Sequence, residues 1–388
     1  MEQDLQRQQA ELMTAGPLKL LIFQGTPFCN IDCSYCYLPN RSDKSRIDVA
    51  TVAQAVSRAV EEGLVGQDLE VLWHCGEPLV LPPSLYEQFF QCIEDQLGSR
   101  CKVSHAIQTN ATLLNDRWGQ LLRHWNVKVG VSLDGPRDLH NRCRKDRQGK
   151  GTFDQVMKGV ALLQKSGVPF YVISVLHRES LDKPQELFDF FSAHDIREVC
   201  FNVEEIEGVH GHSSLQTADA EARVRDFYLA YFRLVERQGA HWLREYEHSL
   251  RALFASRLGN SMVTPYEMLT VDHAGNYATY APELLNAQLG DGSSFILGNV
   301  HDQSLSFAEA LARRSSVVNE IDRGTRLCQM TCQYFDMCGG GSPSNKMSEH
   351  KTFVATETVY CRFGTKAPLE AMALHLKGRI GDAAAATA

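Results

Sequence analysis

The 388-residue sequence lacks the segments that direct a chain to export or into a membrane. Residues 1–16, MEQDLQRQQAELMTAG, are polar and charged and contain no apolar core of a signal peptide. No run of about 18 apolar residues occurs, so no transmembrane helix is predicted. Positive charge is not in excess either, because the formal net charge is −8, and this argues against a nucleic-acid-binding surface. We therefore expect a cytoplasmic protein that binds neither a membrane nor a nucleic acid.

The absence of an export signal also argues against a disulfide framework for the twelve cysteines. Most of these cysteines fall into two groups, one near each end of the chain: Cys29, Cys33 and Cys36, and then Cys328, Cys332, Cys338 and Cys361. Clustered thiolates are typical ligands of zinc or of iron–sulfur clusters. The scattered cysteines, among them Cys75, are predicted mostly to be small buried hydrophobic residues.

Short apolar runs alternate with longer amphipathic stretches from residue 18 to about residue 205. The apolar runs predict six strands, at residues 18–23, 69–76, 101–112, 127–135, 169–177 and 198–204. Repeats of this kind predict a parallel sheet with crossover helices. Six repeats are too few for a closed eight-stranded barrel. We therefore expect an α/β fold built on a partial (β/α)6 TIM barrel.

The pattern changes beyond residue 206. The chain becomes mostly helical and then short-stranded and turn-rich, with VDHAGNYATY (271–280) as a candidate hairpin. These changes divide the chain into an N-terminal extension (1–17), the barrel (18–206), a helical linker (207–262), a turn-rich domain (263–365), and a C-terminal helix with a frayed tail (366–388).

The first cysteine group, in FCNIDCSYCY (28–37), has three thiols where a structural zinc site needs four protein ligands. No further cysteine or histidine completes the group nearby. A [4Fe–4S] cluster held by three cysteines leaves one iron open for a small molecule. The group follows the first predicted strand, which places it at the C-terminal mouth of the barrel. Three incidental cysteines, or a zinc site completed from a distant segment, are the alternatives.

The spacing CxxxCxxC with an aromatic residue before the last cysteine resembles the radical S-adenosylmethionine (radical SAM) enzymes. Here the motif consists of Cys29, Cys33, Tyr35 and Cys36. The resemblance implies that the amino and carboxylate groups of SAM chelate the open iron. It also implies that one electron, provided by an external reductant, cleaves SAM to methionine and a 5′-deoxyadenosyl radical.

A second motif of the same family follows at the end of the second predicted strand. HCGEPLV (74–80) resembles the family's GGEP motif, whose backbone and glutamate receive the SAM amino group. Gly76 and Glu77 match that motif, whereas Cys75 stands where the family has its first glycine. The resemblance therefore implies Gly76 and Glu77 as SAM-binding residues and assigns no role to Cys75.

Three further stretches resemble the SAM-side strands of peptide-modifying members. IQTNATLL (107–114) and the segment that begins VSLDG (131–156) imply polar contacts to SAM from Asn110, Ser132 and Arg144. VISVLH (172–177) resembles the strand whose backbone lines the adenine. The order of these stretches after the cysteine motif is the order found in the family.

The second cysteine group has four members and no open position, so its spacing alone fits either a fully ligated cluster or a zinc site. This segment resembles the SPASM extension of radical SAM peptide maturases, which holds two auxiliary [4Fe–4S] clusters. The thiols of the first auxiliary cluster, expected near Tyr280 and at Ser342, are missing. The resemblance therefore implies one auxiliary cluster, held by Cys328, Cys332, Cys338 and Cys361, and two [4Fe–4S] clusters in the whole chain.

WHCGEPLV, CGGGSPSNK and TETVYCR resemble a narrower group, the cyclophane-forming maturases of ribosomally made peptides. The resemblance implies that the radical removes a β-hydrogen from a residue of a precursor peptide and that the carbon radical then adds to an aromatic ring. The adduct must lose one electron and one proton, so an electron sink and a proton acceptor are needed. His74, Glu204 and Glu205, at predicted strand ends facing the barrel mouth, are the candidate proton acceptors.

Three other functions compete with this one. A thioether-forming peptide maturase has the same architecture but joins a cysteine sulfur to carbon. A maturase that oxidises Ser or Cys, as in sulfatase maturation, would normally keep both auxiliary clusters. An iron–sulfur electron carrier or scaffold would leave the SAM-side motifs without a role. Because about 17 residues precede the first predicted strand, leader-peptide binding is expected to use the core or a separate protein.

Overall fold

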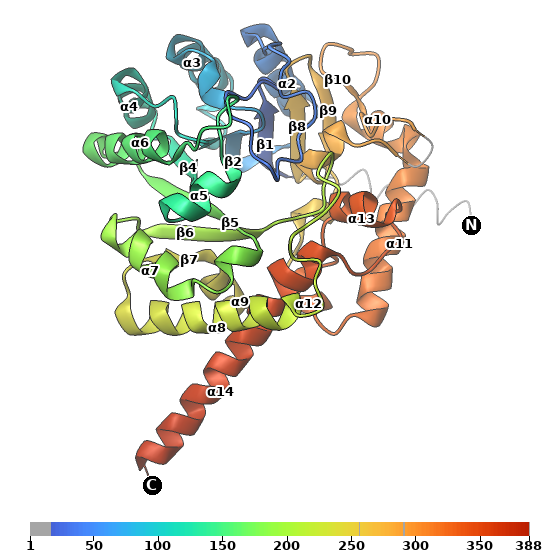
Figure 1. The fold of residues 1–388 in the computed structure, drawn as a ribbon. Helices are drawn as coiled ribbons and strands as arrows, with labels where there is room; N and C mark the ends of the chain where they lie inside the picture. The colour runs from blue at the N-terminus through green and yellow to red at the C-terminus, as the bar shows by residue number, and fades with distance from the viewer. Residues whose placement is uncertain (1–16, 256, 290–291, 388) are drawn as a thin grey trace.

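The computed structural model describes residues 17–255, 257–289 and 292–387, so most of the expected N-terminal extension lies outside the described residues. One sheet runs through the protein in the order β10-β9-β8-β1-β2-β3-β4-β5-β6-β7 (Figure 1). Its strands are β1 (Leu18–Gln24), β2 (Val65–Trp73), β3 (Lys102–Thr109), β4 (Lys128–Ser132), β5 (Phe170–Leu176), β6 (Glu198–Val203), β7 (Trp242–Leu243), β8 (Met268–Asp272), β9 (Asn276–Thr279) and β10 (Gly298–Asn299).

The six expected strands are β1 to β6, and each pairs in parallel with the next. The connecting helices lie around the outside of these strands (Figure 1) and are α2 (Val49–Glu61), α3 (Pro83–Leu97), α4 (Asp116–His124), α5 (Arg137–Cys143), α6 (Phe153–Ser166) and α7 (Pro184–Ala193). The expected parallel α/β fold is therefore confirmed. Strands β7 and β10 stand at the two ends of the sheet, which leaves it open, as expected of a partial barrel.

Local sequence explains why these elements form. Helix α2 begins after Asp48, whose carboxylate accepts a hydrogen bond from the Thr51 backbone N–H at 2.8 Å. Strand β1 is buried between its neighbours and the helices, as parallel strands usually are. Phe23 of β1 stacks on Trp73 of β2, and Trp73 stacks on Phe89 of α3, with ring centroids 4.8 and 4.7 Å apart. Each such pair contributes about 0.5–1.5 kcal/mol beyond its buried area.

The rest of the chain adds helices beyond the barrel, and α10 to α13 gather on the side of the molecule opposite α4 and α6 (Figure 1). They are α8 (Ala220–Gln238), α9 (Arg244–Phe254), α10 (Phe307–Arg313), α11 (Ser315–Thr331), α12 (Phe335–Cys338), α13 (Pro343–His350) and α14 (Ala367–Thr387). Short helical turns are η1 (Pro78–Val80), η2 (Arg178–Ser180), η3 (Ser261–Val263), η4 (Pro282–Asn286) and the π-helical η5 (Cys361–Lys366). Within the described ranges, no helix is both long and apolar enough to cross a membrane.

The expected hairpin at residues 271–280 is confirmed as the antiparallel pair β8 and β9. Its turn is fixed by the Asp272 carboxylate, which accepts hydrogen bonds from the backbone N–H groups of Ala274 and Asn276. Strand β8 also pairs in parallel with β1, so the hairpin extends the barrel sheet. The expected tail is instead helical to Thr387, because its alanine run favours helix.

Candidate active site

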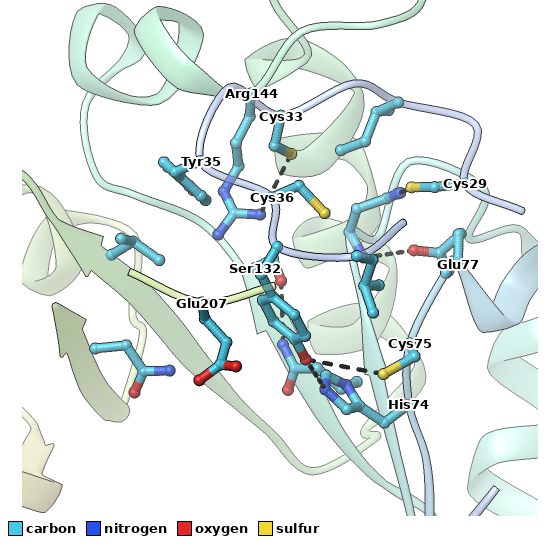
Figure 2. A pocket seen from close by; sticks show the side chains of 18 of the residues that line it. Cys29, Cys33, Tyr35, Cys36, His74, Cys75, Glu77, Ser132, Arg144 and Glu207 are labelled. Carbon is cyan, nitrogen blue, oxygen red and sulfur yellow. Dashed lines mark hydrogen bonds between the residues drawn. The ribbon is translucent and has the colours of Figure 1, made fainter. Parts of the chain in front are cut away.

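A pocket of about 260 Å³ opens where the parallel strands β1 to β6 end (Figure 2). All the site residues expected from the N-terminal part of the sequence line it: Cys29, Cys33, Tyr35, Cys36, His74, Gly76, Glu77, Asn110, Ser132, Arg144, Glu204 and Glu205. They come from different strand ends that the parallel topology brings to one place. The pocket is thus the candidate site for small-molecule and peptide chemistry.

The loop that carries the three cysteines is bound by the last residue of α5 and by the segment that follows it. The Asp32 backbone N–H donates to the Lys145 carbonyl at 2.7 Å, and the Ser34 N–H donates to the Cys143 carbonyl at 3.0 Å. The loop is also held by Arg41 and Arg147, whose side chains donate hydrogen bonds to the Cys33 and Cys29 carbonyl oxygens. The positions of the thiols are therefore set by the fold.

The three thiols suit a cationic cofactor. Burial is the largest cause that raises the pKa of Cys29 and that of Cys33, each to about 12. At Cys29 and Cys33 a thiolate is thus destabilised unless a metal centre takes the place of the proton. The Asn110 side-chain amide lies 3.9 Å from Cys29 Sγ and the Arg144 guanidinium 4.0 Å from Cys33 Sγ, so donors already face the sulfurs. This donor set fits a [4Fe–4S] cluster with one open iron.

Arg144 reaches the pocket from a buried ion pair. Its Nε and Nη2 atoms lie 3.0 and 3.1 Å from the two oxygens of Asp134, which is 1% exposed. The Tyr35 hydroxyl donates to the same carboxylate at 2.6 Å, and the Val175 backbone N–H does so at 3.0 Å. Burial opposes ionisation of Asp134, but Arg144 and these donors hold its pKa below the usual value. The Nη1 group points toward Cys33 Sγ instead of Asp134, so it is available to bind an anion in the pocket.

Glu77 is a buried carboxylate oriented by three donors. Its Oε1 atom accepts from the Leu79 N–H at 2.9 Å and from the Thr109 hydroxyl at 2.6 Å, and its Oε2 atom accepts from the Asn110 N–H at 2.8 Å. Burial raises the pKa of Glu77 to about 7, against the effect of these hydrogen bonds. A cationic group in the pocket would stabilise the ionised form.

The two residues before Glu77 adopt the left-handed backbone conformation, with φ of 70° at Cys75 and 57° at Gly76. A Cβ atom at Gly76 would lie 2.2 Å from the Thr26 carbonyl oxygen, so only glycine fits there. Cys75 adopts this conformation despite its side chain, at a cost of about 1–3 kcal/mol. Its Sγ atom lies 3.8 Å from the Tyr37 hydroxyl, at the pocket wall (Figure 2).

Ser132 and His74 also line the pocket, and His74 lies beside Cys75 (Figure 2). The Ser132 hydroxyl accepts a hydrogen bond from the Gln108 side chain at 3.1 Å. His74 Nε2 lies 3.3 Å from the Tyr37 hydroxyl, and burial lowers the pKa of His74 to about 4. His74 is therefore neutral at pH 7, and its lowered pKa makes it a weak proton acceptor.

Glu204 and Glu205, the two glutamates expected from the sequence, differ in the number of hydrogen bonds that their carboxylate oxygens accept. Glu204 accepts hydrogen bonds from the Ser214 N–H at 2.9 Å and from the Ser214 hydroxyl, and it lies 3.3 Å from His210 Nε2. Glu205 accepts one from the Asn345 side chain at 2.7 Å. Both glutamates line the pocket, but Glu204 binds residues of its own loop, whereas Glu205 accepts its hydrogen bond from α13.

Two further glutamates, Glu207 and Glu283, line the pocket and were not expected from the sequence. Burial raises the pKa of Glu205 to about 8 and that of Glu207 to about 7, and the charge of Glu283 adds to both shifts. Glu207 accepts hydrogen bonds from Ser348 and, at 3.1 Å, from Asn345. The spacing of glutamates in VEEIEG could have indicated Glu207, but Glu283 arrives from η4, far along the chain.

The second cysteine group is also brought together. Cys328 lies near the end of α11, Cys338 ends α12 and Cys361 begins η5. Burial raises the pKa of Cys361 to about 12, and the nearby Cys338 and Cys332 contribute to that shift. Within the described ranges, no three His, Cys, Asp or Glu side chains are arranged to hold one metal ion between them. The ligands of a [4Fe–4S] cluster have a different arrangement, since each thiolate binds a different iron atom.

Known proteins resemble this chain over most of its length. The Radical SAM superfamily model matches residues 23–191. An uncharacterised protein of Synechocystis is 35% identical over 361 residues, which cover 91% of this chain and 90% of that protein. The serine-type anaerobic sulfatase-maturating enzyme of Bacteroides thetaiotaomicron is 26% identical over 354 residues, 86% of this chain and 84% of that enzyme.

Two solved structures share the fold. "Native anSMEcpe with bound AdoMet" has a TM-score of 0.75 and 21% identity, and the match covers 93% of this chain and 99% of that one. Streptococcus suis SuiB bound to its precursor peptide SuiA has a TM-score of 0.63 and 15% identity, with coverage of 92% and 79%. The family match, the similar relatives and the thiol-lined pocket lead to one conclusion: the chain is an enzyme of the radical SAM superfamily, with a [4Fe–4S] cluster and SAM as cofactors.

Proposed function

We propose that this enzyme matures a ribosomally made precursor peptide by joining the β-carbon of one residue to the aromatic ring of another, which forms a cyclophane. The observation that carries the proposal is a direct contact between the pocket and the region of the second cysteine group. Asn345 and Ser348 of α13 donate hydrogen bonds to the pocket glutamates Glu205 and Glu207. A single helix therefore links the pocket to a second potential redox centre.

The pocket residues have separable roles in this proposal. Cys29, Cys33 and Cys36 hold the open cluster, Glu77 receives the SAM amino group, and the Nη1 group of Arg144, which faces Cys33 Sγ, receives its carboxylate. Gly76, Tyr35, Asn110 and Ser132 complete the cofactor-binding wall. When bound, the cluster and SAM supply the 5′-deoxyadenosyl radical that removes a hydrogen atom from the peptide. The protein's part is to orient the peptide and to receive the proton that the aromatic ring releases.

The oxidation of Ser or Cys is the second candidate, because the Bacteroides relative is a serine-type anaerobic sulfatase-maturating enzyme. The residues at the positions of the missing thiols favour a single auxiliary cluster. Tyr280 is buried in an apolar cluster with Phe295, and the Ser342 hydroxyl lies 2.8 Å from that of Ser344. A cluster that keeps four thiolates, on Cys328, Cys332, Cys338 and Cys361, has no vacant iron and suits electron transfer.

The experiment that tests the proposed activity follows one hydrogen atom. The reduced, reconstituted enzyme is incubated with SAM and with the peptide encoded beside its gene, carrying deuterium at the β-carbons. We expect deuterium in 5′-deoxyadenosine and a peptide that has lost one deuterium atom and one hydrogen atom, both detected by mass spectrometry. Unlabelled 5′-deoxyadenosine together with an unmodified peptide would contradict the proposal.

We propose Glu205 as the proton acceptor, because its carboxylate accepts fewer hydrogen bonds than that of Glu204, the other glutamate expected from the sequence. Replacing Glu205 by Gln should lower the amount of crosslinked peptide per SAM cleaved by about a hundredfold or more, the typical contribution of a general base. In the wild-type enzyme this ratio should rise with pH through about 8, because only the ionised carboxylate accepts a proton. Glu204→Gln is the matched control, and it should leave the ratio unchanged. If both variants form the same amount of crosslinked peptide per SAM cleaved, Glu205 is not the proton acceptor, and His74, Glu207 and Glu283 become the candidates.

A further inference from the structure

Lys346 is a buried cation beside the second cysteine group. It lies on α13, is 3% exposed, and its Nζ atom donates to the Gly324 carbonyl at 3.1 Å and to Cys328 Sγ at 3.4 Å. Neither partner carries a negative charge unless Cys328 is a thiolate. Cys328 Sγ also lies 3.6–4.0 Å from the backbone carbonyl oxygens of Gly340, Ala355 and Thr356, so Lys346 is the cation that directly faces this sulfur. A buried ammonium group is strongly destabilising without a counter-charge, and a thiolate bound to a cluster would provide one.

We propose that Lys346 raises the reduction potential of the iron–sulfur cluster at Cys328, Cys332, Cys338 and Cys361, and so makes this cluster a better electron acceptor. This inference rests on the second cluster of the proposed function. With four thiolates a [4Fe–4S]2+ cluster has a net charge of −2, and the gain of one electron takes it to −3. A fixed positive charge beside a ligating sulfur stabilises the more negative state more strongly. Hydrogen bonds to the sulfurs act in the same direction.

Lys346 lies on α13, the helix that also contacts the glutamates of the pocket. Its neighbour Asn345 donates hydrogen bonds to Glu205 and Glu207, and Ser348 donates one to Glu207. The helix therefore contacts the pocket carboxylates through Asn345 and Ser348, and the second cysteine group through Lys346. The ring adduct of the peptide must lose one proton and one electron. Helix α13 contacts both Glu205, the proposed proton acceptor, and the second cysteine group, which would hold the proposed electron acceptor.

The test measures a reduction potential. In full-length protein with Cys29, Cys33 and Cys36 replaced by Ala, the remaining cluster is titrated against redox mediators and followed by electron paramagnetic resonance. Lys346→Met keeps the length of the side chain and removes its charge. At one fixed potential we expect the ratio of reduced to oxidised cluster to fall at least tenfold, which is a shift of 59 mV for a one-electron couple. Lys346→Arg, which keeps the charge, should restore the ratio.

Lys158→Met, on the exposed face of α6, is the control for an unspecific loss of charge, and it should leave the potential unchanged. If Lys346→Met does not retain the cluster, Lys346→Gln replaces it, with the same tenfold fall expected. A retained cluster with an unchanged potential in the uncharged variant would overturn the role of Lys346 alone. Zinc, or no metal, in the parent protein would overturn the second cluster and this inference with it.

Discussion

Replacing Cys29, Cys33 and Cys36 together by Ala is expected to abolish SAM cleavage and to lower the iron content from about eight to about four atoms per chain, as two [4Fe–4S] clusters require. The three thiols line one pocket and are held by a loop that is anchored through its backbone, so their replacement removes ligands without removing the loop's hydrogen bonds. The measurements are 5′-deoxyadenosine by chromatography and iron by elemental analysis.

Glu77→Gln is the matched control for this result. It retains the three thiols and should keep about eight iron atoms with an unchanged cluster spectrum. It should bind SAM roughly tenfold to a hundredfold more weakly, since a charge-assisted hydrogen bond contributes about 1.5–3 kcal/mol. SAM cleavage by the triple variant would contradict the assignment of the open cluster. An unchanged SAM affinity of Glu77→Gln would remove Glu77 alone from the site.

Loss of the second cluster is expected to uncouple SAM cleavage from crosslinking. Cys332→Ala removes a half-buried thiol that follows α11 and is one of the four proposed ligands of this cluster. The variant should still form 5′-deoxyadenosine but should give little or no crosslinked peptide, because the ring adduct cannot pass on its electron. Both products are measured in one reaction. Cys92→Ala, which removes a half-buried thiol on α3 outside both groups, should behave as the wild type.

Metal ligation also stabilises the fold around it, so a poorly soluble variant would not test electron transfer. The informative protein is a soluble one that keeps the first cluster and lacks the second. Cys332→Ser, Cys338→Ala and Cys361→Ala provide alternatives if Cys332→Ala is insoluble. Full crosslinking by any variant shown to lack the second cluster would contradict an electron-transfer role for it.

The barrel and its pocket could be predicted because both follow from local pattern and topology. Apolar runs between amphipathic stretches identify parallel strands, and parallel strands end on the same side of a sheet. Cys29, Glu77 and Asn110 therefore meet, although many residues separate them in sequence. The pairing of β8 with β1 could not be predicted, because a short apolar strand carries no signal that names its partner.

Parts of the site depend on tertiary contacts that no local pattern contains. Asp134 pairs with Arg144 because both are buried between β4, β5 and the cysteine loop, and the sequence SLDG does not reveal that burial. Glu283 joins the pocket from η4. The sequence around Lys346 does not distinguish it from other polar residues of short helices, because its contact with Cys328 forms only in the folded protein.

The most direct test of the proposed function is the covalent structure of the peptide made by the wild-type enzyme. The product is treated with iodoacetamide and with a hydrazide and is then fragmented in a mass spectrometer. We predict that it has lost two hydrogen atoms, that every cysteine of the peptide is still alkylated, that no carbonyl is labelled, and that fragments on either side of an aromatic residue stay linked through a carbon–carbon bond. A cysteine that no longer reacts, as in a thioether, or a hydrazide-labelled carbonyl, as in an oxidised Ser or Cys, would contradict cyclophane formation.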